Sequence, residues 1–221
     1  TIIKYSAYII FMRIELVGGM GVGKTTLCRV LEEVGYNCIY EDLGQNPFMD
    51  GLYKDVENYK FPAQIWFILS KFHEIQEKLE PGQINILDQA MDNYKAYARM
   101  LFKDGSDDGG YKIIDDMFSY TEDRFGPPDL MVYLKVSPET QLKRVLSRKR
   151  SYEAGVELSY LQALRQELDG VVNEAKAKGR HIIEIDTEEI FMPEHHLFAR
   201  QLAEDIAQQL NFCLYPLQKT A

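Results

Sequence analysis

Five short apolar stretches of the chain are rich in β-branched or aromatic residues; they lie at residues 12–17, 36–40, 84–88, 130–136 and 181–186. Several of them lack polar alternation, which is typical of strands covered on both faces. Helical spacing fills the intervals, as in 24–35, which closes on Gly35, and in 61–82, which closes on Pro81 and Gly82. This alternation predicts an α/β fold with a five-stranded parallel sheet flanked by helices.

The remaining segments give no sign of a second domain. Segment 137–150 opens with Ser-Pro, a start signal for a helix. Segment 102–112 is rich in Gly and Asp and is expected to be a loop, whereas 193–212 has helical spacing. Residues 1–11 precede the first strand and are expected to be an extension. We therefore interpret 1–221 as one domain.

Composition and charge limit the kinds of ligand and partner that the chain can bind. The chain has 221 residues, of which 46% are hydrophobic, and it carries 25 Lys and Arg against 34 Asp and Glu, a formal charge of −9. A net acidic chain is poorly suited to binding nucleic acid, so an anionic ligand needs a local basic cluster. No apolar run is long enough for a membrane span. Cys28, Cys38 and Cys213 have no metal-binding spacing, and we expect a reducing, cytoplasmic location.

Residues 18–25 match the pattern G-x-x-x-x-G-K-[ST] between the first strand and a helix. In that setting backbone N–H groups converge on phosphate oxygens, Lys24 reaches the β- and γ-phosphates, and the Thr25 hydroxyl can bind Mg²⁺. The pattern predicts a nucleoside triphosphate site. The expected phosphate-binding residues are Gly18, Gly19, Met20, Gly21, Val22, Gly23, Lys24, Thr25 and Thr26.

Two acids follow strands that should end beside this loop. Glu41 comes after the second strand, where it could take a proton from an attacking hydroxyl; a solvated loop acid is the alternative. Asp88 closes the third strand, where an acid commonly orients Mg²⁺ opposite the loop hydroxyl; capping the next helix is its alternative role.

A basic cluster at Arg144, Arg148 and Arg150 meets the need for local positive charge. The first two share a helix face, and the group is interpreted as a lid over about 144–156 that neutralises charge during phosphoryl transfer; a solvated face is the alternative. Gln64 lies in an apolar stripe, and its amide offers the donor and acceptor that match a base edge.

Together these residues resemble the deoxynucleoside kinase family. Glu41 follows the second strand, Tyr53 stands eleven residues before Gln64, and "RVLSRKRSYE" matches the family lid through Arg144, Arg148, Arg150 and Glu153. "NPF" at 46–48 is similar to the bacterial deoxyadenosine/deoxyguanosine branch. The resemblance covers residues 12–186 and implies a P-loop kinase that transfers the γ-phosphoryl group of ATP to the 5′-OH of a deoxyribonucleoside.

The resemblance also implies residue roles. Glu41 would be the general base, with Lys24 and Arg150 completing the catalytic set, while Arg144, Arg148 and Arg150 would hold ATP. Mg²⁺ would be bound at Thr25 and Asp88, and a homodimer is expected. The residues implied in substrate binding are Glu41, Phe48, Tyr53, Gln64, Lys71, Asp88 and Glu153.

Two positions depart from the family pattern. The motif [DE]-R-S reads Asp88-Gln89-Ala90 here, so the arginine that accompanies the base is replaced by Gln89. The acid expected six residues after Asp88 is Tyr94, with Asp92 or Asn93 as nearby substitutes. Two alternatives stay open, and the missing arginine favours only the second. One is a thymidylate-type nucleoside monophosphate kinase, and the other is a kinase-like accessory subunit without turnover.

Overall fold

The computed structural model describes residues 12–189 except 34, 151, 152 and 154, together with 201, 205 and 208. The extension predicted over 1–11 lies outside the described residues, and so does the helix predicted over 193–212 apart from three isolated positions. In the described part of the chain, no helix combines the length and apolar character needed to cross a membrane.

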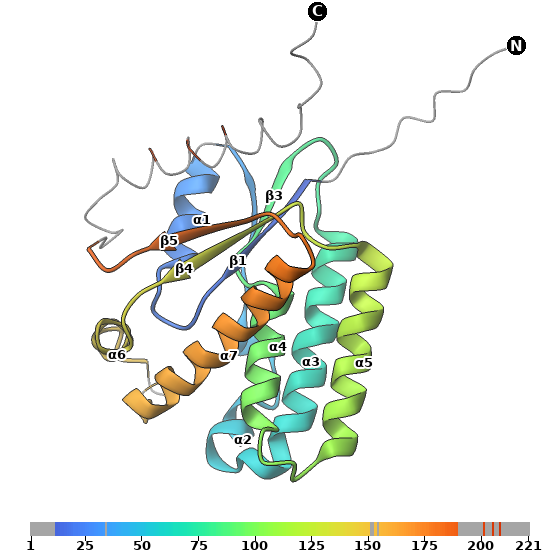
Figure 1. The fold of residues 1–221 in the computed structure, drawn as a ribbon, viewed down its shortest axis with the longest axis vertical. Helices are drawn as coiled ribbons and strands as arrows, with labels where there is room; N and C mark the ends of the chain where they lie inside the picture. Colours follow the sequence, from blue (N-terminus) through green and yellow to red (C-terminus); the bar gives the residue numbers. More distant parts are fainter. Residues whose placement is uncertain are drawn as a thin grey trace, which may run out of the picture.

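The predicted five-stranded parallel sheet is confirmed (Figure 1). Its order is β2-β3-β1-β4-β5. The strands are β1 (Met12–Val17), β2 (Asn37–Ile39), β3 (Ile84–Leu87), β4 (Leu130–Lys135) and β5 (Ile182–Asp186). Because every pair is parallel, all carboxyl ends reach one edge of the sheet.

Alternation along the central strands separates two apolar faces. On β1, Ile14 and Leu16 pack with helix α1 (Lys24–Glu33), whereas Val17 faces the opposite layer. That layer contains α4 (Met91–Leu101) and α7 (Leu158–Ala177), which pack on each other. The sheet is thus covered on both sides, which explains its nearly continuous apolar strands.

The remaining helices extend this second layer and border the sheet edge. Figure 1 shows α3 and α5 beside α4, and Phe67, Tyr94 and Phe118 are among the residues that form their common core. The elements are η1 (Leu43–Gln45), α2 (Met49–Lys54), α3 (Val56–Glu77), α5 (Asp108–Phe125) and α6 (Pro138–Ser147).

Two predicted boundaries were wrong, and a capping aspartate explains each. Helix α3 begins at Val56 rather than at 61, because the Asp55 side chain accepts from Asn58 N at 3.3 Å. Likewise α5 begins inside the predicted loop, where Asp107 accepts from Gly110 N at 2.8 Å. In both cases the stabilisation by the N-cap outweighs residues that disfavour a helix. These residues are Pro62 inside α3 and the glycines in the first turn of α5.

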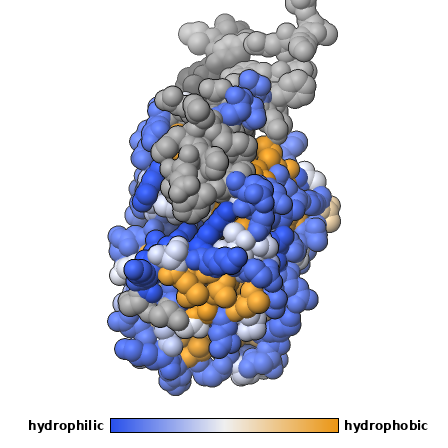
Figure 2. All heavy atoms as spheres, turned by 90° about the vertical axis from the view of Figure 1, so that its left-hand side faces the viewer, coloured by the Kyte–Doolittle hydropathy of each residue, from blue (hydrophilic) through white to orange (hydrophobic). Residues whose placement is uncertain are grey.

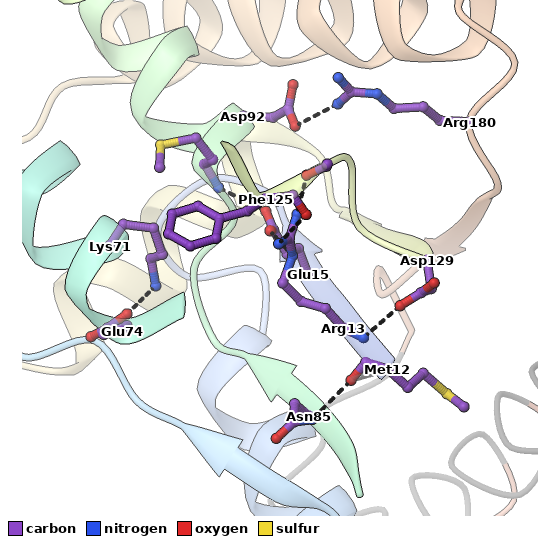
Figure 3. Close-up of polar contacts among 12 residues, drawn as sticks. Met12, Arg13, Glu15, Lys71, Glu74, Asn85, Asp92, Phe125, Asp129 and Arg180 are labelled. Atoms are coloured by element: carbon purple, nitrogen blue, oxygen red, sulfur yellow. Dashed lines mark hydrogen bonds and ion pairs between the residues drawn. The ribbon is translucent and has the colours of Figure 1, made fainter. Parts of the chain in front are cut away.

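Buried charges between β1 and the α4–α7 layer are paired (Figure 3). Arg13 Nε lies 2.9 Å from Glu15 Oε1, and Asp92 Oδ2 lies 3.2 Å from Arg180 Nη1. Burial raises the pKa of Asp92 to about 6, although Arg180 opposes the shift. Asp92 is therefore committed to this structural pair.

Candidate functional site

A pocket of about 670 Å³ opens at the carboxyl edge of the sheet. Figure 2, which views the molecule from the α6 side, shows a hydrophobic area near the centre of this face, bordered by hydrophilic residues. The pocket brings together thirteen of the predicted site residues. They are Met20, Gly21, Gly23, Lys24, Thr25, Thr26, Glu41, Tyr53, Gln64, Asp88, Arg148, Arg150 and Glu153.

The loop between β1 and α1 has a conformation that requires glycine. Gly18 has φ +146°, and an added Cβ would lie 2.7 Å from Leu134 O. Gly21 has φ +82°, with Val145 Cγ2 3.0 Å from the corresponding position. Lys24 Nζ donates back across this loop to Gly18 O at 2.6 Å. The loop thus has the compact, glycine-dependent conformation that a phosphate-binding loop needs, and phosphate binding stays a prediction.

Thr25 and Asp88 form the pair expected around Mg²⁺. Thr25 Oγ1 donates to Asp88 Oδ2 at 2.8 Å, and Asp88 Oδ1 is buried with no partner among the described residues. Those residues contain no group of three His, Cys, Asp or Glu placed to hold a metal. Two protein oxygens fit Mg²⁺, which usually keeps waters and phosphate oxygens as its other ligands.

Glu41 faces the phosphate loop from the end of β2. Desolvation raises its pKa, opposed by a hydrogen bond from Tyr94 and by the positive charges of Lys71 and Lys24. The pKa of Lys24 is lowered by its own burial, with Asp88 and Glu41 acting against the shift. Each group thus shifts the pKa of the other, which places the carboxylate and the ammonium group within electrostatic reach of each other in the pocket.

Two buried polar side chains of the pocket each have an oxygen without a hydrogen-bond partner among the described residues. Gln64 is only 2% exposed, and its Oε1 has no hydrogen-bond partner among the described residues. Glu153 is 5% exposed; one oxygen lies 3.3 Å from Arg150 Nη1, while Oε2 has no described partner. A buried amide oxygen and a buried carboxylate oxygen without partners are suited to a polar ligand.

Sequence reasoning missed two tyrosines of this pocket, Tyr97 and Tyr160. Burial raises the pKa of both hydroxyls, so they stay protonated at neutral pH. Tyr97 stands three residues after Tyr94 on α4, which places both on one helix face. That spacing was the available signal, whereas Tyr160 had none.

Three predicted site side chains lie outside the pocket. Arg144 Nη2 donates to Thr187 O at 2.6 Å, because α6 carries it toward the end of β5 rather than toward the loop. Lys71 Nζ donates to Glu74 Oε2 at 2.5 Å within α3 (Figure 3). Phe48 precedes α2 and does not line the pocket.

Three predicted residues of the phosphate loop, Gly18, Gly19 and Val22, contribute to its backbone but are not among the residues that line the pocket. Their place in the loop is the one that the pattern predicts. Of the lid predicted over about 144–156, Arg148 and Arg150 are exposed and follow α6, whereas 151, 152 and 154 lie outside the described residues.

The two departures from the family pattern are tied to the phosphate loop and to Glu41. Gln89 Oε1 accepts from Asn93 Nδ2 at 2.7 Å, and Asn93 Oδ1 accepts from Gly18 N at 3.0 Å. Tyr94 Oη donates to Glu41 Oε1 at 2.6 Å. The first turn of α4 therefore holds both the loop and the acid, a role that sequence reasoning did not assign.

Comparisons with known proteins relate this chain to one family. The model of the family described as "Deoxynucleoside kinase" matches residues 14–211. The chain is 33% identical to deoxyadenosine kinase of Dictyostelium discoideum over 153 residues, which are 68% of this chain and 62% of that protein. It is 25% identical to deoxyadenosine/deoxycytidine kinase of Bacillus subtilis over 211 residues, or 93% and 94% of the two chains.

A solved structure of deoxyadenosine kinase from M. mycoides with bound dCTP superposes with a TM-score of 0.76 at 19% identity. The match covers 90% of this chain and all of that chain. At this identity the superposition establishes the shared fold. The chain spans about three fifths of the Dictyostelium relative, 62% of its length.

Asn93→Ala tests the tie between α4 and the phosphate loop. It removes the acceptor of the buried Gly18 N–H, so we expect the free energy of unfolding to fall by about 1–3 kcal/mol. Denaturant titration measures the change. Gln76→Ala is the control, since it removes an exposed amide on α3 and should change stability by less than about 0.5 kcal/mol. Equal effects of both substitutions would contradict the tie.

Proposed function

The chain belongs to the deoxynucleoside kinase family, and we propose that it transfers the γ-phosphoryl group of ATP to the 5′-OH of a deoxyribonucleoside. The observation that carries this proposal is the shared pocket. A phosphate loop with its lysine, an acid held by the Tyr94 hydroxyl, and a buried amide whose oxygen has no partner among the described residues line the same pocket. Triphosphate, primary alcohol and base edge each find a matching group there.

In the proposed reaction Glu41 accepts the proton of the 5′-OH, whose oxygen then attacks the γ-phosphorus. Lys24 holds the β- and γ-phosphates, and Arg148 and Arg150 offset the charge of the phosphoryl group from the lid side. Both arginines line the pocket and are exposed, which fits groups that close on a ligand. Arg144 is left out, because it bonds Thr187.

Thr25 and Asp88 are the residues proposed to hold Mg²⁺. When bound, the ion supplies positive charge to the β- and γ-phosphate oxygens. Asp88 Oδ1, which is buried and has no hydrogen-bond partner in the described part of the chain, supports this assignment. On the acceptor side, Tyr53 and Glu153 are proposed to bind the 3′-OH and Gln64 the base edge.

Two alternatives are weaker. A monophosphate acceptor needs a basic residue beside Glu41, but Lys60 Nζ is buried against Glu57 at 2.8 Å and Ser106 at 2.6 Å. Lys54 is not among the residues that line the pocket. An accessory subunit without turnover is disfavoured because the acid, the loop lysine and two arginines share one pocket.

We also propose a cytoplasmic homodimer. The thiols of Cys28 and Cys38 are free, which fits a reducing compartment. Helices α3 and α5 expose Leu69, Ile113 and Tyr120, and they lie together on the right-hand side of Figure 1. Exposed large apolar residues on two adjacent helices are suited to packing against a second copy.

The proposal is tested by turnover of ATP with a panel of deoxynucleosides and deoxynucleoside monophosphates. We expect phosphorylation of at least one deoxynucleoside and none of the monophosphates. Activity confined to monophosphates would establish the thymidylate-type alternative, whereas inactivity across the panel, with ATP still bound, would establish the accessory subunit.

Glu41→Gln should lower kcat about a hundredfold or more, because the amide cannot accept the proton. ATP binding, measured by calorimetry, should stay unchanged. Glu33→Gln changes an exposed acid at the end of α1 and serves as the control. Unchanged turnover in the Glu41 variant would remove this residue from the mechanism.

Gln64→Leu should weaken substrate binding without lowering the free energy of unfolding. The substitution removes a buried oxygen without a described partner, so the protein should be at least as stable as before. The KM for the deoxynucleoside should rise about tenfold or more, while the KM for ATP stays the same. An unchanged nucleoside KM would show that Gln64 does not bind the base.

Leu69→Glu should convert a homodimer into monomers of 25.6 kDa, because it places a charge at the centre of the proposed contact. Light scattering measures the mass. Leu146→Glu is the matched control, since Leu146 is similarly exposed but lies on α6. A monomeric unsubstituted protein would reject the dimer and leave the proposed reaction untouched.

A further inference from the structure

The residue that stands where the family arginine is expected brings no positive charge to Glu41. Gln89 is buried, and its amide oxygen accepts from Asn93 Nδ2 at 2.7 Å. Asn93 in turn binds Gly18 N and Leu16 O. This chain of amides connects α4 to the phosphate loop and brings no positive charge to the acid.

The contact that Glu41 does make comes from Tyr94. The Tyr94 hydroxyl donates to Glu41 Oε1 at 2.6 Å, a short hydrogen bond to a charged acceptor. Its ring is 4% exposed and stacks on Phe67, with centroids 5.2 Å apart and an angle of 11° between the planes. A side chain clamped in this way presents its hydroxyl in one direction.

We propose that Tyr94 is the positioning residue for the general base, taking the place of the arginine expected at 89. Its hydroxyl holds Glu41 through Oε1 and leaves Oε2 for the proton of the acceptor hydroxyl. This inference rests on the proposed kinase reaction. In that step the 5′-OH proton moves to Oε2, the new O–P bond forms, and the bond from γ-phosphorus to the bridging oxygen breaks with its electrons passing to ADP. Tyr94 keeps its own proton throughout.

The surrounding charges agree with this assignment. Tyr94 stays protonated because burial and the nearby Glu41 raise its pKa well above the ordinary value. Lys71 Nζ lies 5.9 Å from the centre of its ring and is held by Glu74. The charged and titratable groups that act on Glu41 include Tyr94, Lys71, Lys24 and Asp88, and Tyr97 is also within electrostatic reach. The predicted lid contributes Arg148, Arg150 and Glu153 to the same pocket.

The test is the pH dependence of kcat/KM in Tyr94→Phe. The phenylalanine keeps the ring packing and loses only the donor. Because a hydrogen bond to a carboxylate lowers the pKa of that carboxylate, its loss should raise the pKa of Glu41 and move the acid limb upward by about one pH unit. On the acid limb itself kcat/KM should fall about tenfold, whereas well above the limb the loss should stay within about threefold.

Tyr97→Phe is the matched control, since it removes another buried hydroxyl from the same helix and pocket. Its acid limb should not move. A loss of equal size at every pH in Tyr94→Phe, or equal shifts in both variants, would overturn the inference. If Tyr94→Phe does not fold, 3-fluorotyrosine at position 94 replaces it. That stronger donor should move the limb downward, and an unmoved limb would again overturn the inference.

A second readout separates this inference from the proposed function. Carboxyl ¹³C NMR titration, with Glu41→Gln to assign the signal, reports the pKa of Glu41 without turnover. We expect a higher midpoint in Tyr94→Phe and no change in Tyr97→Phe. An unmoved midpoint would reject the role of Tyr94. Inactivity of the unsubstituted protein on every deoxynucleoside would instead reject the kinase reaction, and the NMR titration would still decide the Tyr94 contact.

Discussion

The parallel pairing of β3 with β1 and β2 is the constraint on which the rest of the structure depends. It brings the carboxyl ends of three strands to one edge of the sheet. The phosphate loop follows the first of these strands in sequence, Glu41 the second and Asp88 the third. None of these groups is adjacent in sequence. Their approach is a consequence of sheet register, which the buried residues of the central strands stabilise on both faces.

That convergence places the acid Glu41 and the amine of Lys24 together where both are largely buried. Burial raises the pKa of Glu41 and lowers that of Lys24, and each group opposes the shift of the other. One buried side-chain oxygen on each of Asp88, Gln64 and Glu153 has no hydrogen-bond partner among the described residues. A buried polar atom without a hydrogen bond lowers the stability of the fold. Such atoms are typical of binding sites, where a ligand supplies the missing hydrogen bonds.

Helix α4 connects the phosphate loop and the proposed base more directly than any motif indicates. Asn93 binds the loop backbone, and Tyr94 binds the acid one residue later. Adjacent residues on a helix point about 100° apart, so one turn can serve two partners. A shift of α4 would move both contacts at once, which couples the position of the acid to that of the loop.

The sequence by itself determined the strands, the phosphate loop and the acids that follow the strands, because these depend on local patterns and on the polarity of a parallel sheet. It also placed Gln64, through a polar residue in an apolar stripe. Only the tertiary structure decided where long side chains end. Arg144, Lys71 and Phe48 lie outside the pocket because nearby acceptors or helix direction draw them away. Tyr94 joins Glu41 across 53 residues, and such a contact is set by packing against α3, which no local pattern encodes.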